Sequence, residues 1–386
     1  MPEKSYIYCD WAAGGPPRVE VFDAVRKYAT EHFANPGAHH PLAYIARRQL
    51  MELHERAAKI FACDPREIIF TSGGTESDIL ALRGVMALRA GGRDELVVSM
   101  IEHHAVLLCA EQMQAEGFKV RFAPVTADGV VDLAALKLLV NERTSLVSVM
   151  YANNETGVVQ PVAEIARLAH DAGARYHCDA VQAMGKVDLK PRDFGADLMS
   201  LAGAKFGGPK GTGLLFNRMT GRLAPLMVGG PQEWGYRAGT EDTPGQAGIT
   251  TALELAEAER ANVWPRVQKI RDAMEAKLTR ALGADIRING RKAPRLPNIS
   301  NISFLGIEGQ ALGIELGEAG FCVGLGSACA PGETDPSHVL RAMGLSFEDA
   351  QGCIRISFGA DIKEADADRL ADECIKHYGR LKVLGR

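Results

Sequence analysis

A lysine among small residues is the side chain that most suggests covalent chemistry in this sequence. Lys205 lies in LMSLAGAKFGGPKGTG, residues 198–213, directly after an apolar run that favours a β-strand. A lysine amine at the end of a strand, in a confined pocket, can form a covalent bond with an aldehyde. An ordinary surface lysine is the alternative, and this residue alone does not decide between the two.

A second segment has the form of a phosphate-binding turn. Residues 68–77 read IIFTSGGTES, a strand followed by two glycines and by Thr75, which opens a helical pattern. Backbone N–H groups at such a helix start, with the helix dipole behind them, bind phosphate well. A tight strand-to-helix turn capped by Thr75 explains the same residues without a ligand.

Three further polar segments follow apolar runs between these two. They contain His103, Asn154 and Asp179, and Gln182 lies three residues after Asp179. A carboxylate directly after a buried strand is costly unless a cation faces it, and a protonated pyridine nitrogen would be such a cation. Asp179 could instead cap the next helix. The order of phosphate-type turn, His, Asn, Asp and Lys, each after its own strand, favours the chemical interpretation.

Short apolar runs that alternate with helical patterns must position these residues. This alternation is typical of an α/β domain around a mainly parallel sheet, in which ligands bind beyond the carboxyl ends of the strands. The strands of this sheet are expected at residues 68–71, 96–100, 120–125, 146–151, 174–178, 198–201 and 213–216.

A smaller α+β domain is predicted after this region. A long helical pattern covers about residues 250–282, with an interruption near Trp264 and Pro265, and strands are expected at 299–304 and 353–358. The N-terminal segment should pack on this second domain. We therefore expect a large domain at residues 16–260 and a small domain formed by residues 1–15 and 261–386.

The bulk properties of the chain exclude several classes of partner. Its 386 residues carry a formal net charge of -4 without a block of like charges, so we expect no nucleic-acid or anionic-membrane binding. The first residues lack a secretory pattern and no apolar run reaches the ~18 residues of a membrane span, so we expect a cytoplasmic protein. The eight cysteines have no zinc-site spacing. We therefore expect free thiols and no metal.

The whole chain resembles the cysteine desulfurases of the NifS/IscS type, which are class V aminotransferase-like members of the fold type I pyridoxal-phosphate enzymes. The shared motifs occur in one order along essentially the full length. They are Tyr8 to Ala12, Asn35-Pro36, TSGGTES, EHHAV, NNETGVVQP, CDAVQ, AGAKFGGPKG, GGPQEWGYRAGT (229–240), GSACA (326–330), PSHVLRAMG (336–344) and IRISFG (354–359).

The resemblance implies a role for each matched residue. Lys205 would hold pyridoxal 5'-phosphate and move the Cα proton, and Asp179 would pair with the pyridine nitrogen. Asn35 and Arg355 would bind the substrate carboxylate, for which a planar guanidinium is suited. The remaining implied cofactor contacts are ring stacking by His103, contacts with the phenolic oxygen from Asn154 and Gln182, and phosphate binding by Gly74, Thr75 and, across a homodimer, Thr240.

The reaction implied by the resemblance is removal of sulfur from L-cysteine, with His103 relaying a proton. Cys329 would take the sulfur as a persulfide, leaving L-alanine. It lies among small residues, and its spacing to Pro336 matches the long-loop class of the family. That class implies delivery to a docked sulfur-acceptor or iron–sulfur scaffold protein, and we expect iron–sulfur cluster assembly as the destination.

Other functions on the same scaffold stay open at this point. A selenocysteine lyase would share the cysteine, whereas another lyase, an epimerase or an aminotransferase would not need it. Two positions depart from the family pattern, where Ala202 and Ala204 replace the usual Ser and His near the phosphate. A catalytically silent scaffold is therefore a further alternative.

Overall fold

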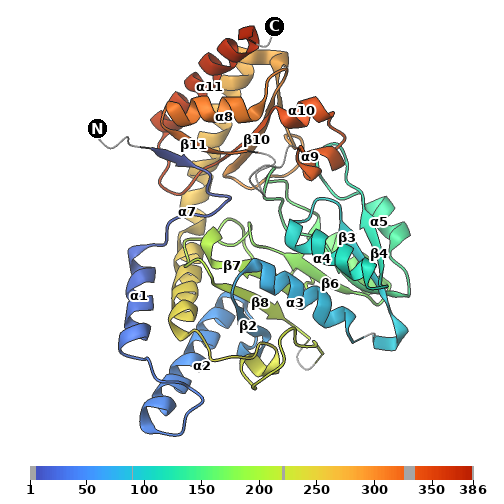
Figure 1. Cartoon of the computed structure of the whole chain (residues 1–386), viewed down its shortest axis with the longest axis vertical. Coiled ribbons are helices and arrows are strands. Elements are labelled where there is room, and N and C mark those ends of the chain that lie inside the picture. Colours follow the sequence, from blue (N-terminus) through green and yellow to red (C-terminus); the bar gives the residue numbers. More distant parts are fainter. Residues whose placement is uncertain (1–5, 89, 220–221, 326–334, 385–386) are drawn as a thin grey trace.

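The computed structural model describes residues 6–88, 90–219, 222–325 and 335–384. Two sheets organise these residues, one in each half of the view in Figure 1. The larger sheet has seven strands in the spatial order β2 (Ile68–Thr71), β8 (Gly213–Asn217), β7 (Leu198–Ala202), β6 (Arg175–Asp179), β5 (Thr144–Ser148), β3 (Glu95–Ser99) and β4 (Lys119–Ala123). Only β8 runs antiparallel to its neighbours. The predicted strands are all present, displaced by at most a few residues.

The large sheet is covered on both faces, which explains why its strands are apolar almost throughout. Alternate residues of one strand enter different cores: Val97 faces one side, whereas Leu96 and Val98 face the other. The helices of this part are α1 (Val19–Thr30), α2 (Pro41–Phe61), α3 (Gly74–Met86), α4 (His104–Ala115), α5 (Leu133–Leu139) and α6 (Val162–Asp171). Helices α3 and α4 supply the second of these cores, and α2 and α6 the first.

The second sheet has five strands and forms its own core. Their spatial order is β1 (Ile7–Cys9), β11 (Phe321–Leu325), β12 (Cys353–Ser357), β10 (Ile299–Phe304) and β9 (Ile286–Ile288). The helices around it are α8 (Gly309–Glu318), α9 (His338–Ala342), α10 (Phe347–Gln351) and α11 (Glu364–Leu384). Strand β1 pairs in parallel with β11, so the N-terminal segment packs on this part of the chain as predicted.

Helix α7 (Thr243–Leu282) connects the two sheets (Figure 1). Ala247 and Leu253 in its first half belong to the large core, whereas Ile270 and Leu278 belong to the small one. The predicted interruption near Pro265 is wrong, because the helix continues through this residue. A proline removes one helical hydrogen bond, but burial of both halves of α7 outweighs that loss. The domain boundary at residue 260 falls inside this helix and stays a prediction.

Within the described ranges, none of the helices has the length and hydropathy that crossing a bilayer requires.

Candidate active site

A cavity of about 290 Å³ lies at the carboxyl edge of the large sheet, where the side chains that follow β3, β5, β6 and β7 meet. Sheets of this kind bind ligands at this edge. Strand β12 of the second sheet contributes Arg355 to the wall. The cavity is lined by Ala12, Ala13, Gly74, Thr75, Asp78, His103, Met150, Ala152, Asn154, Asp179, Val181, Gln182, Ala202, Lys205 and Arg355.

Most of the predicted site residues therefore share one cavity. Those that line it are Gly74, Thr75, His103, Asn154, Asp179, Gln182, Lys205 and Arg355. Asn35 and Thr240 do not line it; both are exposed, and the side chain of Asn35 accepts a hydrogen bond from the N–H of Gly37. Cys329 lies outside the described residues.

Lys205 follows β7 on a short turn and points its amine into the cavity. Its Nζ donates a hydrogen bond to the carbonyl oxygen of Ala13, at 2.6 Å. Burial and the charge of Arg355 lower the pKa of Lys205 below its usual value. A larger neutral fraction makes this amine a better nucleophile and a better base.

Asp179 ends β6, and one of its oxygens accepts a hydrogen bond from the N–H of Val181 at 2.9 Å. Burial raises its pKa to about 6, opposed by that hydrogen bond and by the charge of Lys205. A second buried acid, Asp78 of α3, lines the same cavity, and burial together with the charge of Asp179 raises its pKa well above the usual value. A cationic ligand group facing Asp179 would satisfy the negative charge that this pair cannot hold alone.

His103 directly precedes α4 and caps it, because its Nδ1 accepts a hydrogen bond from the N–H of Ala105 at 3.1 Å. Burial and the charge of Lys205 lower the pKa of His103 to about 4, so the ring is neutral near pH 7. With Nδ1 acting as an acceptor, the proton of the neutral ring resides on Nε2. The imidazole thus offers one N–H donor to its surroundings.

The start of α3 provides backbone donors for an anion. Helix α3 begins at Gly74 and has no side-chain cap, which leaves its first amides available. A Cβ atom on Gly74 would lie 2.9 Å from Cγ2 of Val181, so a larger residue does not fit there. Glycine at this position lets the helix start approach the cavity closely.

Arg355 reaches the cavity already bound to two acceptors. Its Nη1 donates to the carbonyl oxygen of Asn154 at 3.1 Å, and its Nη2 contacts Oδ1 of Asp10 at 2.7 Å. The Nε atom is buried and has no hydrogen-bond partner among the residues that the structure describes. Asp10 therefore orients the guanidinium in the wall of the cavity.

Ala204, which replaces the usual histidine of the family, has different neighbours from the phosphate site that the resemblance implies. The carbonyl oxygen of Ala204 accepts a hydrogen bond from the N–H of Gly15, and Ala204 does not line the cavity. The adjacent Ala202 does line it. In this structure position 204 therefore contacts the N-terminal segment.

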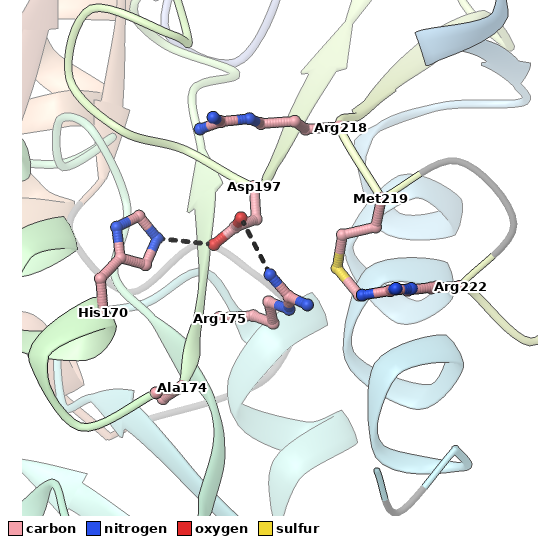
Figure 2. A pocket seen from close by; sticks show the side chains of 8 residues that line it. His170, Ala174, Arg175, Asp197, Arg218, Met219 and Arg222 are labelled. Atoms are coloured by element: carbon pink, nitrogen blue, oxygen red, sulfur yellow. Dashed lines mark hydrogen bonds and ion pairs between the residues drawn. The ribbon is translucent and has the colours of Figure 1, made fainter.

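A larger cavity, of about 580 Å³, lies at the opposite edge of the sheet. Asp197 accepts a hydrogen bond there from Nε2 of His170 at 2.8 Å and lies 3.7 Å from Nη1 of Arg175 (Figure 2). Arg218 and Arg222 complete its polar wall. None of the predicted site residues that the structure describes lines this cavity.

Comparison with known proteins identifies the family. The family model described as "Aminotransferase class-V" matches residues 7–370. This chain belongs to the class-V aminotransferase family. A cysteine desulfurase of Trichormus azollae is 37% identical over 380 residues, covering 98% of this chain and 94% of that protein. The cysteine desulfurase IscS of Clostridium botulinum (strain Kyoto / Type A2) is 38% identical over 367 residues, covering 94% and 91%.

Solved structures agree with this assignment. A structure described as a NifS-like protein superposes with a TM-score of 0.89 at 33% identity and covers 97% of this chain and 100% of its own. Another, described as SspA in complex with cysteine, has a TM-score of 0.80 at 30% identity, covering 91% and 98%. The predicted fold class, with a mainly parallel sheet flanked by helices, is confirmed.

The residues that line the cavity fit pyridoxal phosphate, the cofactor that the resemblance implies. The buried polar atoms of the cavity wall that lack a hydrogen-bond partner within the described chain include Oε1 of Gln182 and Nε of Arg355. Buried polar atoms are normally paired, so these two indicate a polar ligand. The amine of Lys205, the acid of Asp179 and the free amides of α3 match an aldehyde, a ring nitrogen and a phosphate.

Three residues near the site were missed in the sequence. Asp10 binds Arg355, Asp78 lies beside Asp179, and Lys186 is a buried lysine whose Nζ is 3.4 Å from the carbonyl oxygen of Lys205. Burial and the charge of Lys205 lower the pKa of Lys186 to about 7. Helical periodicity could have indicated Asp78, because it lies one turn after Gly74 on the same face of α3.

Proposed function

We propose that this chain is a cysteine desulfurase, which removes sulfur from L-cysteine and leaves L-alanine and a persulfide on Cys329. The observation that carries the proposal is the convergence of Lys205, Asp179 and the uncapped start of α3 on one cavity. This convergence occurs in a chain whose full-length relatives are named cysteine desulfurases.

We assign the binding of pyridoxal phosphate as follows. Lys205 would hold the aldehyde carbon, Asp179 would pair with the ring nitrogen, and His103 would stack on the ring. When bound, the cofactor supplies an electron sink for bonds that break at the substrate carbon. Asn154 and Gln182 would contact the ring oxygen. The phosphate would be bound by Gly74, Thr75 and, from a second copy of the chain, Thr240.

The residues of the chain then divide the proton transfers. Arg355, with Asn35, binds the substrate carboxylate, and Asp10 keeps the guanidinium in place. The lowered pKa of Lys205 suits it to accept the Cα proton. His103, with its proton on Nε2, can donate at one position and be reprotonated from solvent.

Sulfur transfer balances without an added oxidant. The thiolate of Cys329 forms an S–S bond with the substrate sulfur as the carbon–sulfur bond breaks. The electron pair of that bond stays with the carbon, which takes up a proton and becomes the methyl group of alanine. A thiolate is needed for this attack, because the thiol is a weak nucleophile.

We further propose that the enzyme is a cytoplasmic homodimer that passes the sulfur to an acceptor protein for iron–sulfur cluster assembly. The spacing from Cys329 to Pro336 supports delivery to a protein. Leu226, Met227 and Val228 are exposed, Val228 to 88%, and such apolar side chains favour contact with a second chain. Met227 bridges to Arg237, three residues before Thr240.

The proposal is tested by incubating the holoenzyme with L-cysteine and dithiothreitol and measuring alanine and sulfide. We expect the two products in equal amounts and visible absorbance from bound pyridoxal phosphate. Protein that binds no pyridoxal phosphate, or binds it without forming alanine, would overturn the proposal.

A further inference from the structure

The loop at residues 229–240 contains an unfavourable backbone conformation, which has no role in the reaction proposed above. Three consecutive residues have positive φ: Glu233 (47°), Trp234 (60°) and Gly235 (84°). Within the described chain, the only other non-glycine residue with positive φ is Ala62. Left-handed backbone is unfavourable for side chains with a Cβ, so other contacts must hold this turn.

The carboxylate of Glu233, which is only 6% exposed, supplies most of those contacts. Nε1 of Trp234 adds one hydrogen bond, to the carbonyl oxygen of Ile68 at 3.1 Å. Oε2 of Glu233 accepts hydrogen bonds from the N–H of Phe70 at 2.9 Å and from Nε2 of His54 at 3.0 Å. Its Oε1 accepts one from Nε2 of Gln246 at 3.0 Å. These partners come from β2, α2 and α7, so one side chain ties the loop to three elements.

His54 is positioned to carry a positive charge opposite Glu233. Its Nδ1 lies 3.0 Å from the carbonyl oxygen of Leu50, so both ring nitrogens face acceptors and both act as donors. Burial alone would lower the pKa of His54, but the hydrogen bond and charge of Glu233 raise it overall. The result is a buried ion pair at the base of the loop.

The other end of the loop is fixed to the start of α3. Nε of Arg237 donates to Oε1 of Glu76 at 3.0 Å, and Glu76 follows directly after Thr75. The N–H of Gly239 contacts Oε1 of Gln232 at 3.3 Å. These contacts leave Thr240 exposed at the end of a loop that is held in place, away from the cavity of its own chain.

We propose that Glu233 is a positioning residue that holds Thr240 in place for the cofactor phosphate of a second copy of this chain. The inference rests on the proposed function, which assigns Thr240 to that phosphate. The strained turn directs the chain outward, and the contacts of Glu233 keep it there. Without them the turn relaxes, and the hydroxyl of Thr240 no longer occupies one position.

A double-mutant cycle tests this coupling through the release of pyridoxal phosphate from the dimeric holoenzyme, followed by visible absorbance during dialysis. Loss of one hydrogen bond to a charged group predicts that Thr240→Ala releases the cofactor at least about ten-fold faster. We expect Glu233→Gln to accelerate release to a similar extent. In the Thr240→Ala background it should change the rate less than about two-fold.

Glu275→Gln is the matched control for loss of a buried carboxylate. Glu275 lies on the second half of α7, and its carboxylate accepts hydrogen bonds from both Nη atoms of Arg295. The Glu275→Gln substitution should lower the free energy of unfolding without altering cofactor release. If Glu233→Gln does not fold, His54→Gln can replace it, because it removes only the cation opposite Glu233. It should accelerate cofactor release less than Glu233→Gln would. This acceleration should also be absent when Thr240 is alanine.

Two results would overturn the inference. One is unchanged release in Glu233→Gln; the other is equal acceleration with and without Thr240, which would mean a general effect on folding. A third result separates the two proposals: if Thr240→Ala retains cofactor normally in an enzyme that desulfurates cysteine, the inference fails and the proposed function stands. Protein that binds no pyridoxal phosphate at all would fail the proposed function itself.

Discussion

Replacing Arg355 by lysine tests how the substrate carboxylate is held. The guanidinium already binds the carbonyl oxygen of Asn154 through Nη1 and Asp10 through Nη2. Its Nε–H and the second hydrogens of Nη1 and Nη2 remain for the substrate. A lysine ammonium in this place must divide fewer donors among the same two acceptors and cannot form a planar, two-pronged contact.

The expected magnitude follows from one lost contact. A hydrogen bond to a charged group contributes about 1.5–3 kcal/mol, which corresponds to a roughly 10- to 150-fold weaker interaction. We therefore expect Arg355→Lys to raise the KM for L-cysteine by about that factor. The visible spectrum of bound pyridoxal phosphate should change little, because Arg355 is assigned to the substrate.

The assay is steady-state alanine formation over a range of L-cysteine concentrations, with cofactor content measured on the same samples. Arg295→Lys serves as a matched control, because Arg295 is also paired with a carboxylate, Glu275, but does not line the cavity. It should leave KM unchanged. A rise in KM of less than about two-fold in Arg355→Lys would refute the assignment, since one lost contact predicts more.

Three further predictions concern the cofactor, the sulfur and the buried acids. Lys205→Ala should abolish alanine formation and lose the covalently held cofactor, and normal turnover measured in this variant would contradict its role. Cys329→Ala should keep the visible absorbance but release no sulfide, whereas Cys322→Ala, a half-buried thiol, should behave as wild type in both assays. Glu102→Gln should make stability depend less on pH. Burial raises the pKa of Glu102 to about 8 in the folded chain, whereas an unfolded glutamate has a pKa near 4.3. The wild type therefore loses stability as the pH rises from about 4.3 toward 8. Urea unfolding at pH 5 and pH 8 measures the free energy of unfolding that is lost between the two pH values. This loss should be smaller in the variant by at least about 1 kcal/mol, and equal losses would mean that Glu102 ionises freely.

The strands of the large sheet could be predicted because they are buried on both faces. Continuous apolar runs such as Ile68 to Phe70 leave few other structures open to the chain. The shorter strands β1 and β9 were not predicted, because three residues carry little periodicity. Each becomes a strand only through pairing with a distant segment, β1 with β11 and β9 with β10.

The candidate site divides in the same way. Residues directly after predicted strands, such as Asp179 and Lys205, could be placed because the carboxyl ends of parallel strands lie at one edge. Asp10 could not be placed, because its contact with Arg355 requires the N-terminal segment to lie beside β12, where Asp10 bridges to Ser357. Glu233 could not be placed either, because its carboxylate meets residues from three separate elements, β2, α2 and α7.

The central claim is that sulfur leaves L-cysteine and becomes bound to Cys329. The most direct measurement is mass spectrometry of peptides from holoenzyme after a single turnover with L-cysteine and no reducing agent. We predict one added sulfur atom on the peptide that contains Cys329, an equal amount of alanine, and unmodified peptides for the other cysteines. Alanine formation without added sulfur on Cys329, or added sulfur on another cysteine in its place, would contradict the account.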